Sequence, residues 1–186
     1  MNSKTEEAQL DRNILLDDVT RILVRCKILS AQTSKQIAAT TSPDDSRHPF
    51  IQLGELGLRD SSESNLTLST ETITRLIAEA CNITYLRIDP LKIDVEAVTG
   101  LVSQAYATRF QFLPVEVTDG YGIIATAEPY VREWERELAP VLKREIRRVL
   151  ANPADIGKYL KEFYGVSRSL FGAATKVAGE QGIGLS

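Results

Sequence analysis

Apolar side chains recur every three or four residues along several stretches of the chain, and this period predicts amphipathic helices. The first such stretch covers residues 14–27, and a shorter helix follows Ser30, whose hydroxyl can cap it. A polar loop at 40–47 and a glycine-interrupted apolar segment at 48–58 come next. These patterns predict a small helical module over residues 1–60.

The serine-rich run at 59–65 is the strongest linker signal in the chain and marks a predicted domain boundary. The second domain, over residues 66–165, alternates between the periods of helices and strands. Its expected elements lie, in chain order, at 69–80, 85–88, 95–109, 113–117, 123–127, 129–142, 146–150 and 153–165. The turn dipeptide Asp119-Gly120 stands between the strands at 113–117 and 123–127, which predicts a β-hairpin. We therefore predict an α+β fold: the helical module precedes an α/β sandwich with a three- or four-stranded, mostly antiparallel sheet covered by helices.

Proline and glycine positions refine this outline. Pro114 cannot donate a ladder hydrogen bond, so its strand should lie at an edge of the sheet. Asn152-Pro153 is typical of a helix start, and Gly165 should end that last helix. The small, glycine-rich residues at 166–186 are predicted to form a linker.

Composition and charge indicate a globular protein. At 186 residues the chain is long enough for one ordinary domain or two small ones. Its net charge of -3 gives no general reason to expect nucleic-acid binding. No apolar run approaches the roughly 20 residues of a membrane helix, and the acidic, polar start is unlike a secretory signal. Cys26 and Cys81 lie in apolar helical patterns and are expected to be reduced, buried thiols of a cytoplasmic protein.

The best candidates for acid-base or metal chemistry are Asp89, Asp94 and Glu96, in the segment YLRIDPLKIDVEAV. A small hydrolase or a metal site would need these carboxylates to converge on one pocket, with a further ligand or a basic partner. Alternatively, Asp89 starts a turn before Pro90, and Asp94 stands where the N-cap of the next helix belongs. We favour capping, because an N-cap alone stabilises a helix by ~1 kcal/mol.

Few residues are available for other kinds of catalysis. His48 is the only histidine, whereas zinc sites and histidine-based nucleophile pairs usually draw on a cluster of such side chains. We therefore expect His48 to be a solvated loop residue. A phosphate-binding loop needs a glycine, four further residues and then a second glycine followed by lysine. Counted from Gly172, the position of the second glycine is occupied by Val177, so the motif is not met. The glycines at 179–184 follow no expected strand, which excludes a dinucleotide fingerprint. We expect no catalytic residue, no metal ligand and no cofactor in this chain.

A basic cluster spans the end of the third helix of the second domain and the strand that follows. It consists of Lys143, Arg144, Arg147 and Arg148. Such a cluster could meet phosphate or an acidic partner. Because acidic residues lie nearby in the same segment, we predict a solvated, salt-bridged face instead.

Three segments of the second domain, taken together, resemble a known family. They read YLRIDPLKIDVEAV, LPVEVTDGYGIIATAEP and RRVLANPADIGKYLKEFYG. In order and spacing they are similar to the N-terminal region of the ATPases that drive type II secretion and type IV pilus assembly, such as general secretion pathway protein E. The match spans about 66–165. It implies that 166–186 lead toward a motor domain absent from this chain, where ATP and magnesium would bind.

The resemblance also implies a function for this region. It would be non-catalytic and regulatory, would contact its own ATPase domain, and would dock on the cytoplasmic part of an inner-membrane assembly protein. The protein would thus be cytoplasmic and peripheral at the inner membrane through its partner, without inserting into the bilayer itself. We expect an amphipathic helix pair to supply the docking surface at Ile22, Leu23 and Ile28.

An alternative function is cyclic di-GMP sensing, because some relatives bind that nucleotide with a helix pair carrying Arg-Leu-Gly and Gly-Leu-Ile. Here Asp18-Val19-Thr20 and Lys27-Ile28-Leu29 occupy those places. The arginine and both glycines are missing, and a carboxylate at Asp18 would repel phosphate. The resemblance therefore favours docking over nucleotide sensing, and a small hydrolase is the least favoured of the three.

Overall fold

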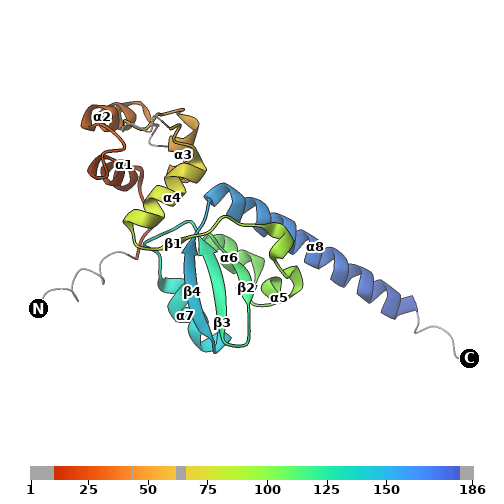
Figure 1. Ribbon diagram of the computed structural model, residues 1–186. Coiled ribbons are helices and arrows are strands. Elements are labelled where there is room, and N and C mark those ends of the chain that lie inside the picture. The colour runs from red at the N-terminus through yellow and green to blue at the C-terminus, as the bar shows by residue number, and fades with distance from the viewer. Residues whose placement is uncertain (1–10, 43, 62–65, 181–186) are drawn as a thin grey trace, which may run out of the picture.

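A computed structural model describes residues 11–42, 44–61 and 66–180, with side chains as far as 169 (Figure 1). The helices are α1 (Leu16–Arg25), α2 (Ala31–Thr40), α3 (Pro49–Glu55), α4 (Thr70–Ala80), α5 (Val95–Thr99), α6 (Gln104–Arg109), α7 (Glu133–Leu142) and α8 (Pro153–Glu180). The strands are β1 (Thr84–Tyr85), β2 (Phe112–Val117), β3 (Tyr121–Thr126) and β4 (Glu145–Leu150). The predicted α+β class is confirmed.

The four strands form one sheet in the order β1-β4-β3-β2. β2 and β3 make the predicted hairpin, and β2, which contains Pro114, lies at the predicted edge. β4 runs parallel to both of its neighbours, so the expectation of a mostly antiparallel sheet is wrong. The reason is that α7 connects β3 to β4, and a crossover helix returns the chain to the end of the sheet at which β3 began.

Two apolar cores meet at the end of β4. The first core lies around the sheet, where α5, α6 and α8 contact β2 and α7 contacts β4. The second core lies among α1, α2, α3 and α4. Val149 belongs to the first core, whereas Leu150 is fully buried in the second. Because α4 packs on α1 and α3, the second core draws on both sides of the predicted boundary at 59–65, and that boundary stays a prediction.

Several local expectations are corrected by the backbone. The single helix expected at 95–109 is two short helices, because the Ser103 hydroxyl caps a new helix by accepting from the Tyr106 amide. The last helix does not end at Gly165 but continues as α8 to Glu180. A glycine inside a helix costs roughly 1 kcal/mol, which flanking helical residues can offset. The role of 166–186 as a linker stays a prediction, and its last residues, 181–186, lie outside the described part.

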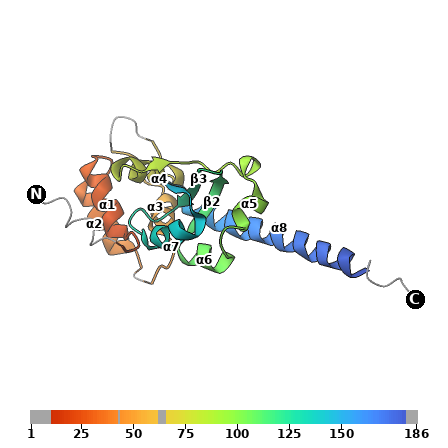
Figure 2. The same cartoon turned by 90° about the horizontal axis from the view of Figure 1, so that it is seen from below.

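The helical α1–α3 region and the far end of α8 lie at opposite ends of the molecule in both views (Figure 1, Figure 2). Within the described residues, no helix is long and apolar enough to cross a bilayer. Both cysteines are free, as expected, but only Cys81 is partly buried. Cys26 is exposed, since it lies just past the end of α1.

Candidate functional site

A cleft of about 770 Å³ lies where the α1–α3 region meets the α+β part. One wall is the chain entering α1, at residues 13–16, and a second is the segment leading into α3. The α+β part supplies the rest through Arg109, Gln111 and Glu128. The cleft is thus bounded by segments that are far apart in the sequence, and it is the candidate site of the described structure.

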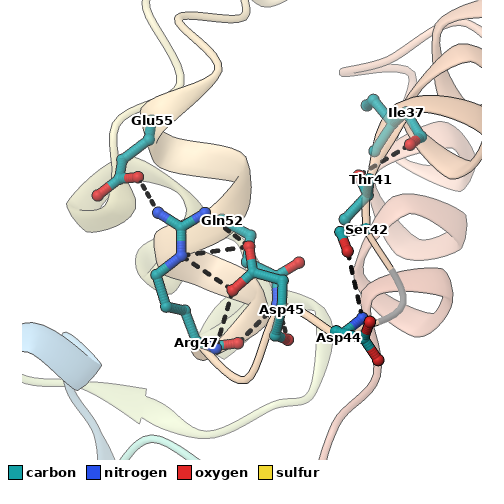
Figure 3. A network of polar contacts seen from close by, with 8 residues as sticks. All are labelled: Ile37, Thr41, Ser42, Asp44, Asp45, Arg47, Gln52 and Glu55. Carbon is teal, nitrogen blue, oxygen red and sulfur yellow. Dashed lines mark hydrogen bonds and ion pairs between the residues drawn. The ribbon is translucent and has the colours of Figure 1, made fainter.

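The segment between α2 and α3 is held by a polar network (Figure 3). The Arg47 guanidinium donates to the Asp45 carboxylate, with Nε 2.9 Å from Oδ1, and also pairs with Glu55. The Gln52 amide nitrogen donates to the Asp45 and Arg47 carbonyl oxygens at 3.2 and 2.6 Å. The Arg47 side chain and, secondly, its backbone N–H donate to the Asp45 carboxylate and hold the pKa of Asp45 below its usual value. The network therefore orders this wall of the cleft.

His48 lies in the cleft wall, not in a solvated loop as expected. It is the N-cap of α3, and its Nδ1 accepts a hydrogen bond from the Phe50 amide at 3.2 Å. Its ring also packs edge-on against Phe50, and its side chain is only 10% exposed. With Nδ1 accepting, the ring proton lies on Nε2, which is 3.3 Å from the Glu128 carboxylate.

Glu128 is a buried acid that joins the two parts of the molecule. It follows β3 and is 4% exposed. Its Oε2 accepts from the backbone N–H of Ile14 at 2.8 Å, while its Oε1 faces His48. A buried carboxylate is costly unless it is hydrogen-bonded. Glu128 was not singled out from the sequence, although it lies in the family-like segment LPVEVTDGYGIIATAEP.

The acidic residues predicted for hydrolysis do not form a catalytic set. Asp94 caps α5, since its Oδ1 accepts from the Ala97 amide at 3.1 Å. Asp89 accepts from the Leu91 amide at 3.2 Å and lies 3.5 Å from the Lys92 ammonium. No group of three or more histidine, cysteine or acidic side chains suited to a metal occurs among the described residues. The capping interpretation is confirmed, and both aspartates of the hydrolase hypothesis are engaged by local backbone amides.

Replacing Asp94 with alanine should lower the free energy of unfolding by about 1 kcal/mol, because α5 would lose its side-chain cap. Urea denaturation of the chain measures this change. Glu162→Ala, at an exposed position of α8, is the control and should fall within ~0.5 kcal/mol of the parent. Equal stability of the two variants would contradict the capping role.

The residues predicted for docking lie mostly in the second core. Leu23 has no exposed area, Ile22 is 7% exposed, and Ile28 is partly buried against the same core. Their packing accounts for the apolar stripe. Partner binding by these residues stays a prediction.

Asp18, which the resemblance places at the arginine position of nucleotide-binding relatives, is paired with a cation. The Arg12 guanidinium reaches both of its oxygens, at 2.6 and 3.0 Å. Asp18 also accepts from the Leu15 amide at the start of α1. The Arg12 contact holds the pKa of Asp18 below its usual value, so the group is a carboxylate at neutral pH.

Two arginines of the predicted basic cluster, Arg147 and Arg148, are paired with acids, as expected. Arg147 donates to Glu145 at 3.0 Å and stacks over the Tyr121 ring at 4.0 Å. Arg148 lies 3.2 Å from Glu135 and donates to the Pro129 carbonyl. Burial lowers the pKa of Arg148 against the pull of Glu135. The predicted salt bridges are confirmed for these two arginines, but the prediction of a solvated face is wrong for Arg148, whose side chain is only 16% exposed.

Comparison with known proteins places these observations in a family. Residues 81–170 match the MshEN domain model. The type IV pilus assembly ATPase TfpB of Acinetobacter baylyi is 32% identical over 138 residues, which are 72% of this chain and 23% of that protein. The chain therefore spans about a quarter of the length of this relative.

The structure of MshE with cdg shows the same fold at lower identity, with a TM-score of 0.53 and 18% identity, and the match covers 81% of this chain and 99% of that one. The N-terminal domain of XpsE is also similar, at 16% identity and a TM-score of 0.47, over 77% of this chain and 91% of that one. The TfpB alignment and the MshEN match confirm the recognised family. The chain contains an MshEN domain and belongs to the N-terminal region of the type II secretion and type IV pilus assembly ATPases.

Proposed function

We propose that this chain is the non-catalytic docking and regulatory region of a secretion or pilus assembly ATPase. In this proposal it binds the cytoplasmic part of an inner-membrane assembly protein, so that the ATPase is held in the cytoplasm at the inner membrane. The observation that carries the proposal is the alignment with TfpB, which pairs 72% of this chain with 23% of a pilus assembly ATPase.

The chemistry of the chain supports a binding role over catalysis. The candidate hydrolytic aspartates cap helices, and the sequence has no glycine-lysine phosphate loop. ATP and magnesium belong, in this proposal, to a motor domain that α8 leads toward. The chain would then transmit the docked state to that domain through contacts with it.

Co-purification tests the docking proposal. The 186-residue chain should be retained by an immobilised cytoplasmic domain of the cognate inner-membrane assembly protein, and an unrelated acidic protein of similar size should not. The eluted chain should also show no ATP hydrolysis above buffer. Failure of the folded chain to be retained would count against docking.

The alternative is cyclic di-GMP sensing, favoured by the fold shared with the structure of MshE with cdg and by the cleft, which has Arg47 and Arg109 on its walls. Against it, Arg47 is engaged with Asp45 and Glu55, and Asp18 holds negative charge where relatives have arginine.

Calorimetric titration with cyclic di-GMP decides between the two. Because a carboxylate at Asp18 repels phosphate, we expect no binding heat at high micromolar nucleotide. The double variant Asp18→Arg with Arg12→Ala serves as comparison, since it restores the cation and removes the group that pairs with Asp18. A saturable heat from the parent chain would establish the sensing function instead.

A further inference from the structure

The chain segment before α1 crosses from the helical region to the α+β part and caps a distant helix there. Asp11 Oδ1 accepts from the backbone N–H groups of Arg132 and Glu133, at 3.0 and 3.2 Å. Its other carboxylate oxygen pairs with Arg136. α7 begins after Arg132 with no cap from the side chain of that residue. Asp11 therefore provides the N-terminal cap of α7 from more than a hundred residues away.

The same segment makes a second, buried contact with the α+β part. The Ile14 amide donates to the Glu128 carboxylate at 2.8 Å, and the Ile14 side chain is 2% exposed in the second core. Because both groups are shielded from water, loss of this bond would leave a buried N–H donor and a buried carboxylate acceptor unsatisfied, which is destabilising. The contact thus fixes the entry to α1 against the end of β3.

Arg12 orients the segment between these two contacts. Its guanidinium forms a bidentate ion pair with Asp18 on α1 and lies 5.5 Å from the centre of the Tyr130 ring. Tyr130 follows Glu128 by two residues, so Arg12 touches both parts of the molecule. Bidentate pairs of this kind define the direction of both side chains.

We propose that residues 11–14 form a releasable strap that clasps the helical region to the α+β part and closes the cleft between them. Asn13 and Ile14 belong to the lining of the cleft, to which Arg109 and Gln111 of the α+β part also contribute. The outer end of the strap is the weaker one, because the Asp11 side chain is 32% exposed, whereas Glu128 is buried. Any partner that draws Asp11 away from α7 would loosen Ile14 from Glu128 and open this wall of the cleft.

Amide hydrogen exchange of the 186-residue chain tests the strap. Asp11→Ala should speed exchange at the Arg132 and Glu133 amides about fivefold, the factor that corresponds to loss of a ~1 kcal/mol cap. The strap also predicts faster exchange at the Ile14 amide, by at least twofold, although its acceptor Glu128 is unchanged. Asp11→Asn should restore the α7 amides, since asparagine caps as well as aspartate does.

Asp17→Ala is the matched control, because Asp17 is an exposed acid in the first turn of α1, outside the strap, whose carboxylate pairs with Arg21 on the same helix. It should leave all three amides unchanged. The converse variant, Glu128→Ala, removes the acceptor of the Ile14 amide and should speed exchange at Arg132 and Glu133, because coupling between two contacts is reciprocal. If Asp11→Ala alters only the α7 amides and Ile14 keeps its parent rate, Asp11 is a local cap and the strap is disproved.

Discussion

Trp134→Ala should lower the free energy of unfolding by about 3–5 kcal/mol. Trp134 is the largest side chain with no exposed area, and its ring lies 4.9 Å from that of Phe112 on β2. It anchors α7 on the sheet, so its truncation leaves a cavity at the centre of the first core. This loss is a large part of the free energy of unfolding of a typical domain, which is about 5–15 kcal/mol.

Urea denaturation followed by circular dichroism measures this change, since the chain has no second tryptophan to report by fluorescence. Val141→Ala is the control on the same helix, because Val141 is 68% exposed and should change stability by no more than ~0.5 kcal/mol. If both variants shifted the midpoint equally, α7 would not be packed on the sheet through Trp134.

Gly54→Ala should destabilise the chain by about 1–3 kcal/mol through overpacking. A Cβ at Gly54 would lie 2.5 Å from the backbone nitrogen of Thr70, at the start of α4. Backbone atoms cannot rotate away as a side chain does, so α3 and α4 would have to separate and disturb the second core.

Gly157→Ala is the matched control for this substitution. Gly157 lies inside α8, and an added Cβ would meet nothing within 4 Å. Alanine should therefore stabilise that helix by up to ~1 kcal/mol. Thermal denaturation of the two variants should give midpoint shifts of opposite sign. A stabilising Gly54→Ala would mean that α3 and α4 do not approach each other closely.

Local sequence signals predicted those elements whose causes are local. The apolar period identified α1, α4 and α7, and the hairpin of β2 and β3 followed from alternation around an Asp-Gly turn. Capping by Ser30, Ser69 and Asp94 could be read from residue type and position alone. Pro114 placed β2 at the edge, because a missing donor is a property of the residue itself.

The remaining features depend on contacts between distant segments. The pattern of β4 gave no information on which strands flank it, so its two parallel pairings were missed. Gly165 was a plausible helix stop by type, but nothing in its surroundings requires the helix to end. The sequence predicted one helix at 95–109, because the apolar period continues through this stretch. The structure has two helices there, and the second begins at the Ser103 cap.

The candidate site was the least predictable part. His48, Glu128 and Asp11 act through partners 80 or more residues away in the sequence, and neither period nor spacing reveals such pairs. Glu128 lies in the family-like segment LPVEVTDGYGIIATAEP, but nothing in the sequence indicated its role. The structure supplies one: the buried Glu128 carboxylate accepts from the Ile14 amide and holds the entry to α1.

The central claim, docking on an inner-membrane assembly protein, is tested most directly by calorimetric titration of the 186-residue chain with the cytoplasmic domain of that partner. The account predicts a saturable binding heat that is unchanged in Asp94→Ala, whose substitution affects only a local cap, and absent with an unrelated acidic protein. A flat titration with the folded chain, at concentrations well above those in the cell, would contradict the claim.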